Sequence, residues 1–293
     1  MSDFADFRGG GRRGKRRDVP SWSGDARGGS GKKGRRRNSG CGCLGFTTIA
    51  VLAIIAMIGA MTMFVGPVEA PFSKEPIPDN VPPAAAEAAP RIDVHAPGRT
   101  ADQLAQWAQP IAEATRIPSS AVRAYGNAEV IAAESWPTCN LTWNTLAGLG
   151  QVETRHGTYT GNWMKPAAIE DDGVVRPPII GVPLDGSPGF AEIKDTDGGV
   201  LDGDTEFDRA VGPMQFIPET WRRHGIDASG DGVADPHHID DAAASAARLL
   251  CSGGRDLATA EGWTSAIRSY NQSDEYVRDV RDAAANYALN QPA

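Results

Sequence analysis

Residues 144–157 read NTLAGLGQVETRHG, and they carry the strongest indication of the fold. Leu146, Leu149 and Glu153 stand at i, i+3 and i+7, a spacing that predicts a helix with all three on one face. A carboxylate therefore lies among apolar neighbours in the last turn, where the helix dipole disfavours negative charge. Dipole and desolvation both raise a carboxyl pKa, which suits a general acid at neutral pH. The alternative is a Glu153 turned to the helix edge or paired with an arginine.

The segments around this helix predict a mainly helical domain over about residues 100–290. Apolar and Ala-rich patterns predict further helices at 119–134, 240–250 and 274–289. Between residues 157 and 216 the chain is rich in Gly, Pro and Asp, which predicts a long irregular insertion with short strands. The expected fold class is thus mainly α, of the α+β kind.

The N-terminal part differs sharply from this domain. Residues 1–43 hold 12 Lys/Arg and 4 Asp/Glu, and a chain of this composition is expected to be a disordered tail. Residues 44–65 are uncharged and long enough to span a bilayer, and the positive-inside rule places the tail in the cytoplasm and the domain outside. A cleaved signal peptide is the alternative, because residues 68–70 resemble a cleavage site, although the apolar run is longer than a usual signal core. The Pro- and Ala-rich residues 66–99 predict a stiff linker.

Charge and cysteine content narrow the function classes. Residues 44–293 carry a net charge of −16, which argues against nucleic-acid binding by the folded part. Cys139 and Cys251 are the two cysteines of the exported part, and an even pair in an oxidising compartment predicts one disulfide. Two buried free thiols are the alternative.

Four segments, in order, resemble lytic murein transglycosylases of the membrane-bound B type, particularly their actinobacterial members. Residues 149–157 (LGQVETRHG) are similar to the family's Glu-Ser-x-x-Gly, with Thr154 in place of serine. Residues 210–221 (AVGPMQFIPETW) resemble Gly-x-Met-Gln-Phe-x-Pro-x-Thr-Trp, and residues 231–243 resemble the next block. Residues 269–277 (SYNQSDEYV) resemble Tyr-Asn-x-Ser-x-x-Tyr-Val. The resemblance spans roughly residues 100–288.

The resemblance implies a lysozyme-like fold and peptidoglycan glycan strands as substrate. It implies that Glu153 protonates the bond between N-acetylmuramic acid and N-acetylglucosamine, and then takes the proton of the C6 hydroxyl that attacks C1. The product is a 1,6-anhydro sugar, and the chemistry needs no cofactor.

The same resemblance assigns supporting roles by position. Gln215 is expected to bind the sugar near the scissile bond, and Tyr270 and Asn271 to orient Glu153 and the acetamido group. Met214 and Phe216 are expected to line the substrate groove, with plain core packing as an equal alternative. His156, next to the catalytic segment, is predicted to be a solvated loop residue.

Two other functions remain open at this level. Acidic residues within 195–208 could supply a second carboxylate for a muramidase that uses water. A non-catalytic glycan-binding or division scaffold is the rival outside the enzymes, with the basic tail as an arm for cell-wall synthesis or division proteins. A carboxylate on an apolar helix face favours the enzyme.

A structural calcium ion is a further expectation. From residue 227 to residue 233, every second residue can offer an oxygen ligand, as in calcium loops. The expected ligands are Asp227, Ser229, Asp231, the Val233 carbonyl and Asp241. The alternative is an Asp- and Gly-rich turn that leads into the next helix, with Asp240 as its N-cap.

Overall fold

The computed structural model describes residues 74–162 and 164–293. The basic tail (1–43), the apolar run (44–65) and the candidate cleavage site (68–70) lie outside the described residues. Within the described ranges, no helix combines the length and apolar character needed to cross a membrane.

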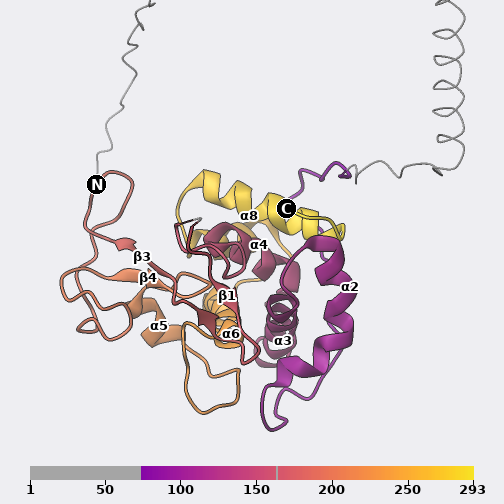
Figure 1. The fold of residues 1–293 in the computed structure, drawn as a ribbon. Coiled ribbons are helices and arrows are strands. Elements are labelled where there is room, and N and C mark those ends of the chain that lie inside the picture. The colour runs from indigo at the N-terminus through magenta and orange to yellow at the C-terminus, as the bar shows by residue number, and fades with distance from the viewer. Residues whose placement is uncertain (1–73, 163) are drawn as a thin grey trace, which may run out of the picture. The chain divides into compact units, whose positions relative to one another are not determined.

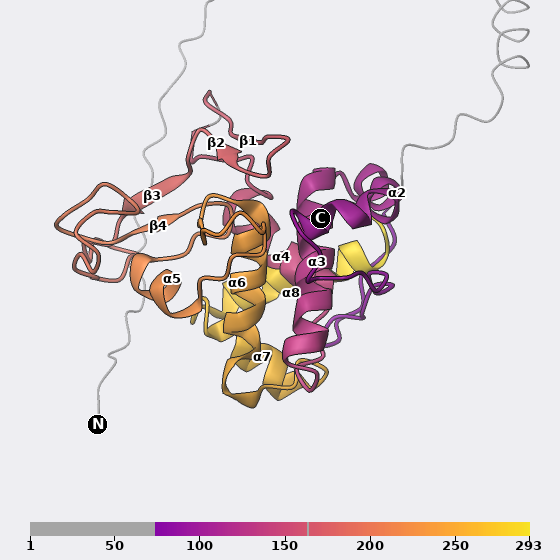
Figure 2. The ribbon, with the colours of Figure 1, turned by 90° about the horizontal axis from the view of Figure 1, so that it is seen from below.

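Four helices form the centre of the domain (Figures 1 and 2). They are α3 (Ser119–Ser135), α4 (Trp143–Thr154), α6 (Ile239–Cys251) and α8 (Asp274–Ala288). The contacts are densest between α4 and α8 and between α3 and α6. Around them lie α2 (Ala105–Thr115), α5 (Pro218–His224), α7 (Ala260–Arg268) and the 3-10 turns η1 (Thr100–Leu104) and η2 (Ser252–Gly254).

Small residues allow these helices to approach closely. Ala243, Ala246 and Ala247 of α6 are fully buried in the core. Gly148 of α4 faces α8, where an added Cβ would lie 2.7 Å from the backbone oxygen of Val280. The Ala- and Gly-rich patterns of the sequence therefore act through helix packing rather than through helix propensity alone.

The predicted helices at 119–134, 144–154, 240–250 and 274–289 agree with α3, α4, α6 and α8 to within one residue at each end. The prediction lacks α5 and α7, which are too short to display an apolar period. Each nevertheless has a local start signal, because Pro218 begins α5 and the hydroxyl of Thr259 accepts from Gly262 N before α7.

The predicted insertion contains two small antiparallel sheets. Strand β1 (Ala168–Ile169) pairs with β2 (Val175–Arg176), and β3 (Ile180–Pro183) pairs with β4 (Arg209–Val211). Figure 2 shows β3, β4 and α5 together on one side of the helices. A mainly helical fold with small sheets is thus confirmed.

Part of the predicted stiff linker packs against the helices. Residues 82–91, here called the strap, run without helix or strand across α3 and α4, held by buried side chains. Asn144 donates to Ala84 O (3.0 Å) and accepts from Ala86 N (3.1 Å). The indole nitrogen of Trp143 donates to Glu87 O at 3.0 Å. Composition predicted the extended conformation but not these partners, which lie more than 50 residues away.

The predicted disulfide between Cys139 and Cys251 is confirmed. It joins the loop after α3 to the end of α6, with a Cα–Cα distance of 5.4 Å across a sequence separation of 112 residues. It therefore closes a loop that contains α4, both sheets, α5 and α6.

Candidate active site

Glu153 lies in the last turn of α4, and the chain turns sharply just after it. Arg155 and His156 both take left-handed conformations, with φ of 52° and 60°, which end the helix. The Thr154 hydroxyl accepts from Gly157 N (2.7 Å) and donates to Pro213 O (2.6 Å). This hydroxyl links the end of α4 to the segment that carries Gln215, which accounts for a threonine serving where the related pattern has serine.

The carboxyl of Glu153 is half-buried and accepts a hydrogen bond from the Tyr276 hydroxyl of α8. Burial raises the pKa of Glu153 to about 7, against the opposing effect of the tyrosine bond. At neutral pH both the protonated and the ionised form are well populated. The predicted position of Glu153 on the apolar face of its helix and the expected rise in its pKa agree with this geometry.

Two pockets meet at Glu153, and among the described residues it is the one that lines both. The first, called the neutral pocket, has a volume of about 590 Å³, and Glu153 is the one acidic or basic residue in its described lining. The second, called the charged pocket, has a volume of about 460 Å³ and also contains Arg155, Asp279 and Asp282. The acid thus lies between two spaces of different electrostatic character, where a polymer could pass it on both sides.

The structure brings four of the predicted substrate residues to the neutral pocket: Gln215, Phe216, Tyr270 and Asn271. Gln215 has φ of 47°, and its amide nitrogen donates to Gly212 O at 2.9 Å. Asn271 is exposed, and its side-chain oxygen accepts from Ser273 N at 2.9 Å, in the turn just before α8.

Tyr270 packs edge-on against Phe216, with ring centroids 5.7 Å apart. The Tyr270 hydroxyl is buried and has no hydrogen-bond partner among the described residues. A buried hydroxyl without a partner is costly, so a bound sugar would supply a favourable contact there.

For Met214 the core alternative holds, and the prediction that it lines the groove is wrong. It is 0% exposed and belongs to the hydrophobic core, and it does not line the neutral pocket. The cause is the tight turn between Val211 and Phe216, whose backbones exchange hydrogen bonds of 2.8 and 3.0 Å. This turn leaves Gln215 at the pocket and Met214 in the interior.

Tyr276, the hydrogen-bond partner of Glu153, had no role predicted from the sequence. It stands within the quoted segment 269–277, and only its position six residues after Tyr270 hinted at a second tyrosine near the acid. The prediction for His156 is wrong: this residue is buried between the hydroxyls of Tyr125 (3.1 Å) and Tyr287 (2.9 Å). Burial lowers the pKa of His156 to about 3, so it is neutral and structural.

The five predicted calcium ligands do not fit a metal. Asp241 accepts from Ala228 N, Ser229 N and Asp235 N at 2.7–2.9 Å, and Asp227 accepts from Gly230 N and Gly232 N. The carboxylates of Asp227, Asp231 and Asp241 do not gather within ligand distance of one another in the described chain. The Asp231 carboxylate accepts from the exposed Val233. The loop thus satisfies its own carboxylates with backbone amides.

The alternative N-cap is also wrong. The ring of His238, not the carboxylate of Asp240, accepts the hydrogen bond at the start of α6. Asp240 is instead buried in an ion pair with Arg99. A long-range partner therefore replaces the local role that the sequence predicted.

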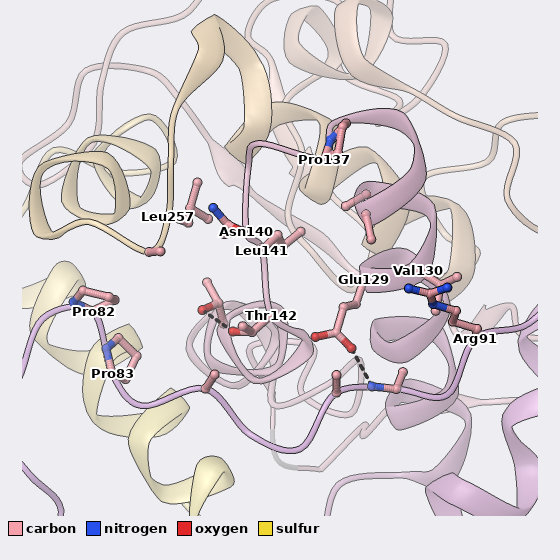
Figure 3. Close-up of a pocket in the computed structure, with 17 residues that line it drawn as sticks. Pro82, Pro83, Arg91, Glu129, Val130, Pro137, Asn140, Leu141, Thr142 and Leu257 are labelled. Atoms are coloured by element: carbon pink, nitrogen blue, oxygen red, sulfur yellow. Dashed lines mark hydrogen bonds between the residues drawn. The ribbon is translucent and has the colours of Figure 1, made fainter.

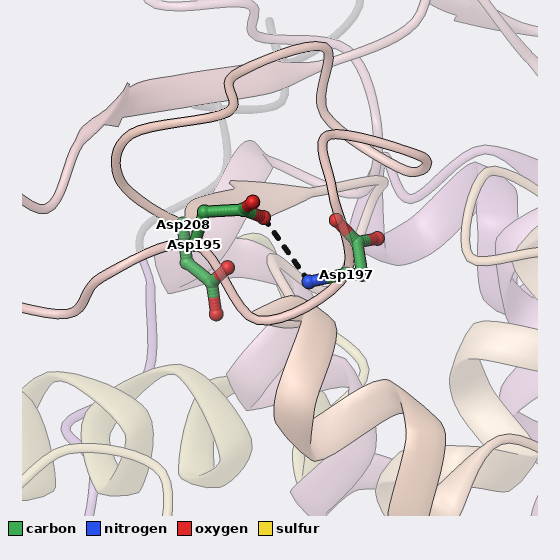
Figure 4. A group of neighbouring side chains, drawn as sticks. All are labelled: Asp195, Asp197 and Asp208. Atoms are coloured by element: carbon green, nitrogen blue, oxygen red, sulfur yellow. Dashed lines mark hydrogen bonds between the residues drawn. The ribbon is translucent and has the colours of Figure 1, made fainter.

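Three acidic residues in the described chain do place oxygen atoms within 4.8 Å of one another: Asp195, Asp197 and Asp208 (Figure 4). Asp195 accepts from Asp197 N at 3.1 Å, and buried Asp208 accepts from the amide and hydroxyl of Thr196 at 2.8 Å each. These bonds make the group the polar interior of a loop. None of the acidic residues in 195–208 lines either pocket at Glu153, so this loop supplies no second carboxylate there.

A third cavity, of about 580 Å³, lies between the strap, α3 and the loop that follows α3 (Figure 3). Its walls are mostly Ala, Pro and Leu, and Glu129 of α3 points toward the strap. Glu129 is 8% exposed and accepts from Ala89 N (2.7 Å) and Trp143 N (3.2 Å). Burial raises its pKa to about 7. This cavity shares no lining residue with the pockets at Glu153.

Comparisons with known proteins connect part of this site to one family. No curated protein matches the chain. A solved structure, the Escherichia coli lytic transglycosylase Slt35 in complex with bulgecin A, is similar at 16% identity over 63% of this chain and 78% of that chain, with a TM-score of 0.36. Residues 207–264, which include Gln215, Phe216 and all of α6, match the family described as the transglycosylase SLT domain.

Proposed function

We propose that this chain is a peptidoglycan lytic transglycosylase. It cleaves the β-1,4 bond between N-acetylmuramic acid and N-acetylglucosamine and leaves a 1,6-anhydro end. The observation that carries the proposal is Glu153, a half-buried carboxyl with its pKa raised to about 7 at the meeting point of two pockets. The match of residues 207–264 to the transglycosylase SLT domain and the ordered motifs around Glu153 support the same activity.

Glu153 acts first as an acid and then as a base. In its protonated form it donates a proton to the glycosidic oxygen, and the bond from that oxygen to C1 breaks. The resulting carboxylate takes the proton of the C6 hydroxyl while the C6 oxygen bonds to C1, which closes the anhydro ring and restores the acid. A pKa near 7 suits both steps, because neither form is costly at neutral pH.

The composition of the neutral pocket fits an uncharged sugar. Its walls combine apolar side chains with the carboxamides of Gln215, Asn271 and Gln272. Such groups can bind acetamido and hydroxyl substituents without attracting ions. Glu153 is the one carboxylate among the described residues that line this pocket, so it serves as the base for the attacking hydroxyl. The C6 hydroxyl has the advantage over water that it is already attached to the reacting sugar.

The test is the product formed from purified peptidoglycan, identified by mass spectrometry. The proposal predicts 1,6-anhydro ends, and the Glu153→Gln variant should form none while it remains folded. Reducing ends would assign a hydrolytic muramidase instead. Binding to glycan without any cleavage would assign a scaffold.

We also propose that residues 44–65 anchor the domain on the outer side of the cytoplasmic membrane. The charge difference across this apolar run supports the orientation, and the Cys139–Cys251 disulfide fits an oxidising compartment. In cells that carry tags at both ends, added protease should reach the C-terminal tag and spare the N-terminal one. The reverse result would contradict the orientation, and a mature N-terminus near residue 71 would identify a cleaved signal peptide.

A further inference from the structure

His156 lies just after Glu153 in the chain, is buried, and takes no part in the proton transfers. Its ring connects two hydroxyls: Nδ1 lies 3.1 Å from the Tyr125 hydroxyl of α3, and Nε2 lies 2.9 Å from the Tyr287 hydroxyl of α8. Tyr287 in turn donates to Oε1 of Gln151 in α4 at 3.1 Å. These side chains, here called the His156 network, join three helices around the turn that follows the acid.

The number of protons fixes the direction of every hydrogen bond in the network. The Tyr287 hydroxyl has one proton, which goes to Gln151, so its oxygen accepts from His156 Nε2. Burial lowers the pKa of His156 to about 3, so the ring is neutral and carries one N–H. With that proton on Nε2, Nδ1 is the acceptor, and the Tyr125 hydroxyl donates to it. The imidazole is therefore held in one tautomer and one orientation.

The backbone at His156 explains why its side chain is held so firmly. His156 has φ of 60°, and its N–H donates to Gly150 O at 2.7 Å, which closes the end of α4. A left-handed backbone is uncommon for a residue with a side chain, so the two ring hydrogen bonds help to hold it there. Gly150 leaves room for the Tyr125 hydroxyl to reach the ring, because a Cβ at Gly150 would overlap that hydroxyl.

Helix α8 is bonded to α4 on both sides of the acid. Tyr276 donates to the Glu153 carboxyl. Tyr287 lies about three turns later on the same face of α8, and it contacts Gln151 and His156. These two residues stand before and after Glu153 in the chain. A shift of this turn against α8 would therefore change the distance between the Tyr276 hydroxyl and the carboxyl.

We propose that His156 is a positioning residue for Glu153. It holds the end of α4 against α8, so that the Tyr276 hydroxyl stays bonded to the carboxyl and the acid keeps its orientation toward the glycosidic oxygen. His156 is not among the described residues that line either pocket, so it acts through the turn and through α8. The expected effect on turnover rests on the proposed function.

The test replaces His156 by phenylalanine, which keeps a ring of similar size and removes both hydrogen bonds. We expect kcat to fall by about tenfold with KM within about twofold, because a displaced acid slows proton transfer more than it weakens binding. The fall of kcat/KM with rising pH should move to higher pH, since the Tyr276 bond that lowers the Glu153 pKa is weakened. His156→Gln restores one acceptor and one donor and should recover most of both changes.

A change of charge is not the cause of the expected shift, because neutral His156 is replaced by an uncharged residue. The titratable and charged groups around Glu153 in the described chain are unchanged in the variant: Tyr270, Tyr276, Arg155, Tyr159, Asp279 and Asp282. The pH profile therefore reports the geometry at the acid.

Two further variants separate positioning from a general loss of stability. Thr100→Val removes another buried hydrogen bond, of 3.0 Å to Asn127, outside both pockets, and it should leave kcat and the pH profile unchanged. The double variant His156→Phe/Tyr276→Phe should show the pH shift of Tyr276→Phe alone, because both changes act on one bond to Glu153.

A direct measurement of the Glu153 pKa completes the test. Tyr125→Phe removes one bond of the network from α3, so it serves even if His156→Phe does not fold. Carbon NMR of carboxyl-labelled glutamate in the full chain follows the Glu153 titration, and Glu153→Gln identifies its signal. We expect the pKa to rise in Tyr125→Phe, by less than in His156→Phe.

An unmoved Glu153 pKa in Tyr125→Phe, a loss of kcat in Thr100→Val equal to that in His156→Phe, or additive pH shifts in the double variant would overturn the proposal. Its failure is distinguishable from failure of the proposed function. A wild type that forms no anhydro product would contradict the proposed function, and the NMR titration would still decide whether His156 positions Glu153.

Discussion

Glu129 and Glu153 are two carboxyls in one domain with the same raised pKa and different surroundings. Burial raises each pKa to about 7. Both oxygens of Glu129 accept backbone N–H groups, one from the strap and one from the start of α4. Within the described part of the chain, the Glu153 carboxyl has one side-chain hydrogen bond, from Tyr276, and it lines two pockets. A perturbed pKa therefore does not identify a catalytic acid by itself: the acid also needs a free lone pair and space for a substrate.

The sharpest way to break this comparison is to neutralise each carboxyl in turn. Glu153→Gln should lower turnover by about 10³-fold or more, because the amide cannot deliver a proton. Glu129→Gln should keep turnover within about twofold, since it lies at a cavity with no shared lining residue. Anhydro-product formation measures both, with circular dichroism as the check on folding. Comparable losses in the two variants would contradict the assignment.

The disulfide belongs to the same region as Glu129, because Cys139 lies in the loop after α3 that lines the cavity at Glu129. Replacing Cys139 and Cys251 by serine opens a loop of over a hundred residues, which in the chain-entropy model costs about 4–5 kcal/mol in the free energy of unfolding. Denaturant melts of wild type and the double variant measure this. Because neither cysteine lines a pocket at Glu153, turnover of the folded variant should stay near the wild-type value. A stable variant with lost turnover would reverse the roles given to the two regions.

Removing the Glu129 carboxyl altogether should cost stability. Glu129→Ala leaves the amides of Ala89 and Trp143 without their acceptor, a loss of about 2–3 kcal/mol in the free energy of unfolding. Urea melts of this variant and wild type measure the loss.

The raised pKa of Glu129 also makes stability depend on pH. The folded state holds the Glu129 proton more tightly than the unfolded state. Protonation of Glu129 therefore stabilises the fold at low pH, and this stabilisation is lost as pH rises through about 7. Urea melts at several pH values between 4 and 8 measure the free energy of unfolding. This free energy should fall less with rising pH in Glu129→Gln than in wild type. The same pH dependence of the unfolding free energy in both proteins would mean that the pKa of Glu129 is not raised.

Tyr276 tests the other side of the comparison. Its hydrogen bond lowers the pKa of Glu153 against the effect of burial, so Tyr276→Phe should raise that pKa. As an acid, Glu153 must be protonated, so kcat/KM falls as pH rises through about 7, and in the variant this fall should move to higher pH. We expect a rate loss of about tenfold or less at neutral pH, because a carboxyl with a higher pKa is a weaker acid and gives its proton to the glycosidic oxygen less readily. An unmoved pH profile would show that Tyr276 does not act on Glu153.

The smallest expected effect concerns calcium. The carboxylates of Asp227 and Asp241 already accept backbone amides, so calcium should shift the melting temperature by less than about 2 °C relative to chelator. A filled site at a hundredfold excess over Kd would add roughly 2.7 kcal/mol and a much larger shift. A large calcium-dependent rise in the melting temperature that is absent in Asp231→Ala would instead support a calcium site in this loop.

Features that depend on the local order of residues were predictable from the sequence. The i, i+3 and i+7 spacing of Leu146, Leu149 and Glu153 placed the carboxyl on an apolar helix face, and Ala-rich periodicity located the four central helices to within one residue at each end. Composition predicted the irregular insertion. Cys139 and Cys251 are the two cysteines that follow the apolar run, and their expected export predicted the disulfide. These features need no knowledge of which helix packs on which.

Features that depend on contacts between distant segments were not predictable in this way. Tyr276 and Glu153 are hydrogen-bonded although they are 123 residues apart in the sequence. Asn144 is hydrogen-bonded to strap residues that are 58 and 60 residues away. No local sequence pattern predicts such bonds. Met214 and Gln215 are neighbours with opposite surroundings because one turn sends Met214 into the core and leaves Gln215 at the pocket. The physical reason is that burial and hydrogen bonding are set by packing, and packing is known only when the helices have come together.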